Sequence, residues 1–448
     1  MYTTTVGRTF LKAYNARFNV DYTAKSFFEE VFIPLFFDYQ KYMMTAGNSP
    51  LENPKLSWED MIKGKKPFET PERRKERIDK MMQKIENEKA DASIAIGYGV
   101  LDDAAATSGQ ITSINFPDNK DDIYLSWIGA GLGIGVAGGV TILFDSAELL
   151  LDIFDGWKYY RQYLENNPLM KGNQINTWNG HWIHHRYDRY GYAFDEDDAT
   201  AGLNPLEKTT EGLFNIPTIS WVKILLGIAM KYSGNNLVGY LYNIGQTNTT
   251  IGFIPFELDD ISRPNHFYEK IFGKDVFMQD IKQIEELYGT AFGLRAACQY
   301  GSIGTKALEP KGIRAFIPSD KGCKKISNTE KDNTIRITFN TYLIWILAML
   351  NNEKLWEESQ KIAQILLQYE AGAGKTRKDR TNNVNQLLDS TSTKLFLQNM
   401  IPIIEDEVKD KKDITEYENL GKMIHIMPKD NFPYFNTLIR FQYALSNK

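Results

Sequence analysis

Cysteine is almost absent from this sequence, and its scarcity excludes several classes of protein. Cys298 and Cys323 are too few for a zinc ribbon or for the disulfide framework of a small secreted domain. The stretch MYTTTVGRTF lacks the basic-then-apolar layout of a signal peptide, which favours a cytoplasmic protein. A basic excess is missing as well, because 52 Lys and Arg stand against 57 Asp and Glu, a net charge of −5. This balance argues against a free-standing protein that coats nucleic acid, but it allows a subunit that contacts nucleic acid through one face.

Long hydrophobic runs are scarce too, and the main exception is rich in glycine. Residues 127–144, WIGAGLGIGVAGGVTILF, carry no charge over 18 residues, which is close to the length of a membrane helix. The run holds six glycines, each of which weakens a helix by about 1 kcal/mol relative to alanine, and no basic cluster flanks it. We therefore expect no membrane contact, and instead a buried strand and a glycine-rich turn that lead into a helix beginning near Asp145.

What is present is the composition of a large globular protein. The 448 residues are 42% hydrophobic and 24% charged, enough for two or three domains with cores of their own. Short strand-like runs such as TIGFIPFEL and IRAFIP alternate with helix-like stretches, and from residue 334 apolar residues recur at helical spacing in long segments. The expected fold class is α+β. A mixed body with short β-sheet elements covers residues 1–333, and a C-terminal helical bundle covers residues 334–448.

Nucleotide-binding motifs are matched only in part. EAGAGKT at residues 370–376 resembles a phosphate-binding loop, but Tyr369 stands where the motif needs its first glycine, and a helix precedes the segment. Residues 133–138 match GxGxxG without a convincing βαβ unit around them. The sequence therefore predicts no cofactor.

Candidates for metal or nuclease chemistry are also incomplete. Three histidines within residues 176–198 would share one face of a helix, yet no HExxH or CxxC pattern accompanies them. A metal site and a nucleic-acid or partner contact are the alternatives to a hydrogen-bonded aromatic loop, which we favour. The pairs Asp102-Asp103 and Asp259-Asp260 lie beside strand-like runs, but neither is followed by the acid-x-Lys element of many nucleases. The sequence thus predicts no catalytic residue and no metal ligand.

Five segments spread over nearly the whole chain share their layout with a known family. They are FFEEVFIPLFF with the following NSP (residues 48–50), TSGQIT, the glycine-rich run with DGWKYYRQYL, GQTNTTIGF, and the terminal LIRFQYAL. Together they resemble the large subunit of type I CRISPR–Cas (Cascade) effector complexes, in a variant without zinc-binding cysteines. None of the segments is a strict motif, so the resemblance rests on their order along the chain.

The resemblance implies a non-catalytic role in antiviral defence. Such subunits lie at the end of an RNA-guided complex that holds the 5′ end of the guide RNA, and they contact the other effector subunits. They bind target double-stranded DNA at the protospacer-adjacent motif and support strand opening, while a helicase–nuclease is recruited for cleavage. The implied partners are therefore the other subunits, guide RNA, target DNA and that helicase–nuclease.

Side-chain chemistry, and not a family motif, indicates which residues would contact DNA. Gln and Asn pair bidentately with adenine, and polar residues beside glycine reach a groove without steric penalty. Two loops fit this description, with local turn hydrogen bonding as the alternative for both. A third loop carries four cations within six residues, which would neutralise phosphates or form an ordinary exposed linker. The candidate DNA-binding residues are Thr107, Ser108 and Gln110; Gln246, Asn248 and Thr249; and Lys375, Arg377, Lys378 and Arg380.

Two functions from other classes stay open at this point. One is a DNA-cleaving restriction or antiphage-defence enzyme whose carboxylates are scattered through the mixed body. The other is a protein-interaction scaffold. Purification separates them, because a nuclease would cut DNA alone with Mg²⁺, whereas the effector subunit would co-purify with guide RNA and partner proteins.

Overall fold

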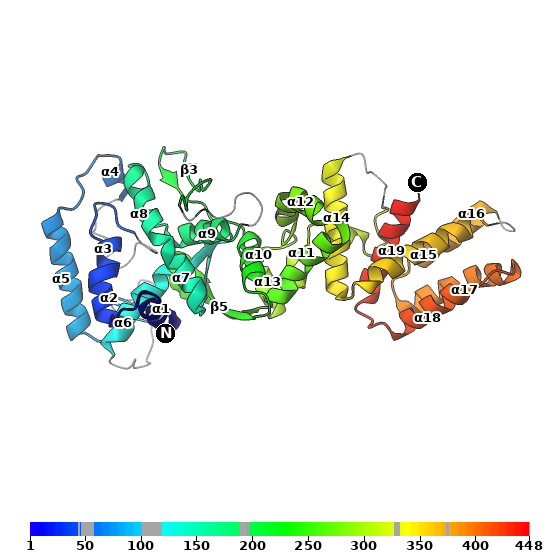
Figure 1. Ribbon diagram of the computed structural model, residues 1–448, viewed down its shortest axis with the longest axis horizontal. Helices are drawn as coiled ribbons and strands as arrows, with labels where there is room; N and C mark the ends of the chain where they lie inside the picture. The colour runs from blue at the N-terminus through cyan, green and yellow to red at the C-terminus, as the bar shows by residue number, and fades with distance from the viewer. Residues whose placement is uncertain are drawn as a thin grey trace. The chain divides into compact units, whose positions relative to one another are not determined.

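Helices make up most of this protein, which the computed structural model divides into two compact units (Figure 1). Helix accounts for 61% of the described residues and strand for 8%, so the α+β class with a helical C-terminal part is confirmed. The first unit comprises Met1–Leu258 and Leu294–Ile303, and the second comprises Asp259–Gly293 and Gly304–Lys448. The structure describes residues 1–43, 45, 58–100, 119–188, 195, 197–326, 332–372 and 376–447, and of residues 246–248 only the backbone.

The first unit contains a four-stranded antiparallel sheet in the order β1-β2-β5-β6. The central strand β2 is buried at every position, which explains why four of the five residues in its sequence VTILF are apolar. Strand β6 lies at the edge of the sheet. A separate two-stranded ribbon pairs β3 with β4. The strands are β1 (Ile134–Val136), β2 (Val140–Phe144), β3 (Glu207–Lys208), β4 (Phe214–Asn215), β5 (Leu237–Asn243) and β6 (Gln246–Phe256).

The glycine-rich run of residues 127–144 is divided between a helix and a hairpin. Helix α6 (Lys120–Gly131) extends into it, and β1 and β2 follow. Gly138 and Gly139 join these strands with φ values of 94° and 68°, a region that glycine enters at no steric cost. The expected turn is therefore present, but it lies within a β-hairpin and not after a single strand. Within the described part of the chain, no helix has the length and apolar character needed to cross a membrane.

The rest of the first unit consists mainly of helices, several of which pack through aromatic side chains. The apolar segment at residues 27–37 packs its rings against α8, where Phe36 and Trp157 meet edge to face with centroids 4.8 Å apart. The charged segment after Thr70 forms helix α5, in which Pro71 occupies the first turn and the Thr70 side chain accepts from the amide of Arg73. The remaining elements are α1 (Tyr2–Phe18), α2 (Ala24–Phe27), the π-helical turn η1 (Phe28–Phe32), α3 (Ile33–Phe36), α4 (Trp58–Ile62), α5 (Pro71–Asn87), α7 (Ala147–Asp155), α8 (Trp157–Asn166), α9 (Ile175–Arg186), α10 (Trp221–Lys231), α13 (Leu294–Ala297) and η3 (Cys298–Tyr300).

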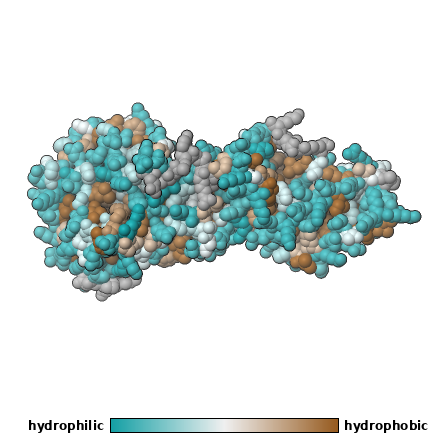
Figure 2. All heavy atoms as spheres, in the orientation of Figure 1, coloured by the Kyte–Doolittle hydropathy of each residue, from teal (hydrophilic) through white to brown (hydrophobic). Residues whose placement is uncertain are grey.

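In its described residues, the second unit consists of helices and the segments that connect them, without a strand. Helix α14 is buried along most of its length and packs against α12 and α19, and α19 also packs on α15. The run IRAFIP, which the sequence suggests as a strand, forms the 3₁₀ turn η5. On the visible face of the protein, hydrophilic residues predominate and hydrophobic ones are scattered (Figure 2). The elements are α11 (Leu258–Phe272), α12 (Lys274–Leu287), η4 (Thr305–Leu308), η5 (Ile313–Phe316), α14 (Asn333–Leu350), α15 (Lys354–Glu370), α16 (Arg377–Leu388), α17 (Thr393–Lys409), α18 (Thr415–Ile426) and α19 (Phe432–Ser446).

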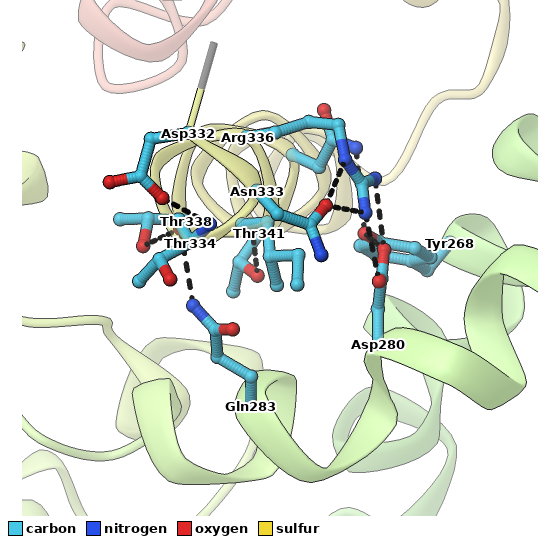
Figure 3. Close-up of polar contacts among 11 residues, drawn as sticks. Tyr268, Asp280, Gln283, Asp332, Asn333, Thr334, Arg336, Thr338 and Thr341 are labelled. Atoms are coloured by element: carbon cyan, nitrogen blue, oxygen red, sulfur yellow. Dashed lines mark hydrogen bonds and ion pairs between the residues drawn. The ribbon is translucent and has the colours of Figure 1, made fainter. Parts of the chain in front are cut away.

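The structure does not divide at residues 333/334, where the sequence predicts a domain boundary. A polar network joins α12 to the start of α14 (Figure 3). Arg336 donates from Nη1 and Nη2 to the two carboxylate oxygens of buried Asp280, at 3.0 and 2.9 Å, and Tyr268 Oη donates to Asp280 Oδ2 at 2.8 Å. A buried carboxylate is stable only with such partners. Helices α11 and α12 therefore belong with the bundle, and the second unit begins at Asp259.

Candidate nucleic-acid interface

The hairpin of β5 and β6 has an irregular tip. Its last strand pair is Asn243 with Gln246, and the pair before it joins Tyr242 to Thr250. Residues 247–249 therefore bulge out of β6, because they have no register position on β5. Bulges bend a strand and redirect its side chains, and they occur often beside functional sites.

The glycine turn between β1 and β2 lies directly beside this tip. Strand β2 pairs with β5 so that Val140 is opposite Asn243, and the amide of Ile244 donates to the carbonyl of Gly139 at 3.0 Å. Two turns that are far apart in the sequence thus meet at the end of the sheet where β2 begins and β5 ends. Gly138 is exposed there, so an approaching ligand meets backbone without a side chain in the way.

Arg295 brings a cation to the same place. It lies in the short helix α13, is exposed, and donates from Nη2 to Oδ1 of Asn243 at the end of β5. Sequence reasoning missed this residue, since only the fold brings α13 back to the first unit. We call this group the turn edge. It comprises Gly138, Gly139, Asn243, Thr249 and Arg295.

The chemistry of the turn edge is that of a binding surface. Arg295 can pair with a phosphate or with a guanine edge, and exposed Thr249 carries a hydroxyl that both donates and accepts. The candidate side chains of Gln246 and Asn248 lie outside the described part of the structure, although their backbone belongs to this edge. The other predicted loop, with Thr107, Ser108 and Gln110, also lies outside the described residues.

The same geometry shows which elements surround the GxGxxG match at residues 133–138. A dinucleotide motif needs a strand that leads through a glycine loop into a helix. Here β1 leads through Gly138 and Gly139 into the antiparallel strand β2. Gly135 is required by packing, since an added Cβ would lie 3.0 Å from the backbone of Asn176 in α9.

The basic loop is divided by the start of α16. Lys375 lies outside the described residues, while Arg377 and Lys378 are exposed in the first turn of the helix. Thr376 caps this helix by accepting from the amide of Asp379. The two exposed cations are in a position to meet a phosphate backbone.

For Arg380 the DNA-binding prediction is wrong. Its side chain is 1% exposed, and Nη2 donates to Asp410 Oδ2 at 2.7 Å. Nη1 donates to the carbonyl of Tyr369 at 3.1 Å and lies 3.5 Å from Glu407 Oε1. The guanidinium therefore links the end of α15 to α17, and no phosphate can reach it.

The histidine-rich segment forms helix α9, and hydrogen bonds to the backbone account for two of its histidines. His181 Nε2 donates to the carbonyl of Pro217 at 2.8 Å, and His185 Nε2 to that of Ala199 at 3.1 Å. Burial lowers the pKa of His184 from its ordinary value to about 4. Across the described residues, no group of His, Cys, Asp and Glu is arranged to hold a metal ion.

Of the two acidic pairs that the sequence suggests for nuclease chemistry, only one lies within the described residues. Asp102 and Asp103 lie outside the described residues. Asp259 and Asp260 occupy the first turn of α11, where negative charge favours the helix dipole, and Asp260 accepts from Arg263 one turn later. The helix dipole and the ion pair with Arg263 are thus enough to explain this pair.

A cavity of about 440 Å³ opens between α1 and α6. Its charged side chains balance, with Arg8 and Lys12 against Asp21 and Asp121, and Arg8 is already paired with Asp122 at 2.5 Å. A phosphate-selective site needs a positive excess, so the turn edge and the start of α16 remain the better candidates.

No family model, no curated protein and no solved structure matches this chain.

Proposed function

We propose that this protein is the non-catalytic large subunit of an RNA-guided type I CRISPR effector complex, which binds duplex DNA at the protospacer-adjacent motif and supports strand opening. The proposal starts from the resemblance of five segments along the chain. Its partners would be the other effector subunits, guide RNA, target double-stranded DNA and a recruited helicase–nuclease.

One observation carries the proposal. Two of the segments that prompt the resemblance, the glycine-rich run and GQTNTTIGF, form neighbouring turns at one edge of the sheet. The hydrogen bond from Ile244 to Gly139 holds these turns together, and Arg295 adds a cation beside them. A contact surface assembled from separate segments, with glycine, amides and one arginine, suits groove recognition better than acid–base catalysis.

Under this proposal the residues divide into two roles. Gln246 and, in the other loop, Gln110 would read base edges, because their amides match adenine bidentately. Arg295, Arg377 and Lys378 would contact phosphates, which position a protein without reading the sequence.

The first test is purification of the chain expressed with its neighbouring genes. The proposed subunit should co-purify with guide RNA and other proteins, and it should not cut DNA with Mg²⁺ or Mn²⁺. Cutting by the isolated chain, lost on substitution of Asp102, Asp103, Asp259 or Asp260 with folding preserved, would identify a nuclease instead.

The second test measures base reading in the assembled complex with a DNA library randomised at the motif positions. Gln110→Ala or Gln246→Ala should relax the motif preference by about 1–3 kcal/mol per lost bidentate contact while assembly stays intact. The matched control is Gln162→Ala, since Gln162 is exposed on α8 in the same unit. If both loop variants keep the wild-type preference, the loops are structural turns.

The third test separates phosphate contacts from base contacts. Replacing Arg295, or Arg377 together with Lys378, should weaken binding to every sequence alike. The slope of log affinity against log salt should fall by about 0.7–0.9 for each phosphate contact that is lost. An unchanged slope would mean that these cations are merely exposed.

A further inference from the structure

The cavity between α1 and α6 has the size and lining of a small-molecule site. Its volume of about 440 Å³ lies within the range of roughly 300–1,000 Å³ that such sites span. Leu11, Ala24 and Leu125 give it a buried apolar lining, and charged side chains make up much of the rest. The cavity therefore suits a molecule with an apolar middle and charged groups at its ends.

Hydrogen bonds within the protein hold the walls of this cavity in place. Asn15 donates from Nδ2 to the carbonyl of Tyr22 at 2.8 Å and accepts from the amide of Tyr22 at 3.2 Å, which fixes the loop after α1. On the α6 side, the side chain of Asn119 accepts from the amide of Asp121 at 3.2 Å. The chain thus forms the cavity by itself, as expected of a binding site that exists before its ligand arrives.

Three charged side chains of the lining are left to meet a ligand. Arg8 is neutralised by its ion pair with Asp122. Lys12, Asp21 and Asp121 are exposed, and none of the three has an ion-pair partner among the residues that the structure describes. The unpaired charges are therefore one cation and two carboxylates. Such a site attracts a ligand with the opposite set of charges, which is two cations and one anion.

The two carboxylates belong to opposite ends of the cavity. Asp121 is next in sequence to the residue that pairs with Arg8, and Asp21 is next to the residue that is bonded to Asn15. Arg8 and Asn15 are seven residues apart on one face of α1, or about 10 Å along the helix axis. Lys12 lies between them on the same face. A ligand that fits this order carries one cation at each end.

We propose that this cavity binds a free basic amino acid, lysine or arginine. Either molecule carries two cations and one carboxylate, the set that complements the unpaired lining. Its α-amino group and its distal head would meet the two aspartates, its carboxylate would meet Lys12, and its methylene stem would lie on Leu11 and Leu125. The inference does not rest on the proposed effector function, because it uses none of the residues assigned to DNA contact.

The test is calorimetric titration of the full chain with four ligands. L-lysine and L-arginine should bind at one site per chain, and binding of only one of them would identify the head group that the site accepts. L-norleucine has the stem of lysine without the distal cation, and cadaverine has both cations without the carboxylate, so each should bind at least about tenfold more weakly. Equal binding of L-norleucine or cadaverine, or no binding of L-lysine and L-arginine at about 10 mM, would overturn the proposal.

Variants of the lining assign the charges. Asp21→Asn and Asp121→Asn should each weaken binding of the basic amino acid roughly tenfold. Lys12→Gln should remove the preference for lysine over cadaverine, because that preference depends on the carboxylate, and a general loss of folding would not produce this selective effect. The matched control is Asp38→Asn, at an exposed aspartate of the same unit outside the cavity, and it should bind as the wild type does.

Thermal unfolding checks that all variants stay folded, which exposed positions should tolerate. If the folded Asp21→Asn and Asp121→Asn variants bind L-lysine and L-arginine like the wild type, the cavity is not the site and the proposal is wrong.

Discussion

Arg377 and Arg380 are three residues apart in α16, yet their surroundings are opposite. Arg377 is exposed, whereas Arg380 lies beneath the end of α15 with Asp410 and Glu407 as ion-pair partners. Four positions of the basic loop look equivalent in the sequence, because charge alone does not show which side of a helix faces the bundle. The position at which α16 begins, after Thr376, determines which residues face the bundle, and it places Arg380 on the buried side of the helix.

We expect Arg380→Ala to destabilise the helical unit by about 3–5 kcal/mol, because it leaves buried Glu407 without one of its cations. Urea unfolding followed by circular dichroism measures this change. Arg377→Ala is the matched control and should stay within about 0.5 kcal/mol of the wild type. Equal stability of the two variants would mean that Arg380 is not held in the buried pair.

His184 gives a pH dependence whose sign can be worked out. Burial lowers its pKa from 6.5 to about 4, so the folded protein resists protonation that the unfolded chain accepts. Stability should therefore be fully present above about pH 6.5 and fall as the pH drops toward 4, by about 3 kcal/mol in all. His184→Gln should flatten the unfolding free energy across this pH range.

How far the sequence predicts single residues depends on whether their partners are local. The cap of α5 was predictable, because Thr70 and Pro71 lie next to the helix that they start. The place of Arg295 was not, since its partner Asn243 is about fifty residues away and the two meet only when α13 returns to the sheet. The candidate Thr249 was identified from its loop, and the fold adds that this loop lies beside the glycine turn.

At the scale of elements, the ion pair between Asp280 of α12 and Arg336 of α14 connects α12 to the helical bundle. We expect Asp280→Asn to destabilise the second unit by about 3 kcal/mol, because Arg336 then loses its carboxylate partner. Thermal unfolding detects the loss. Gln283→Ala removes only an exposed hydrogen bond to the carbonyl of Thr334 and should cost less than about 1 kcal/mol. If Asp280→Asn and Gln283→Ala lower the stability by similar amounts, the ion pair of Asp280 with Arg336 does not hold α12 to α14.

Short apolar runs were the elements that the sequence predicted least well. IRAFIP was expected as a strand, but its buried residues Ile313 and Phe316 are three apart, the period of a 3₁₀ helix. Six residues are too few to distinguish that period from alternation. In contrast, the long segments after residue 334 gave many turns of consistent spacing, and their helices were predicted correctly.

At the scale of the whole molecule, the extent of the second unit predicts how fragments behave. A fragment of residues 334–448 should bind the dye ANS and unfold without cooperativity, because it lacks the carbonyl of Thr305 that accepts from buried Trp345 and the carbonyl of Phe316 that accepts from Arg440. A fragment of residues 259–448 should retain a cooperative transition. If the shorter fragment unfolds cooperatively and does not bind ANS, the boundary at 333/334 is the correct one.

Neither unit is a single continuous stretch of chain, since Leu294–Ile303 returns to the first unit from within the second. This excursion has a genetic consequence. A single recombination event between related genes cannot exchange one unit and leave the other whole, because any crossover that transfers residues 259–448 also transfers the strip that carries Arg295. A helical part that arrives by gene exchange therefore brings its own residue 295 to the turn edge.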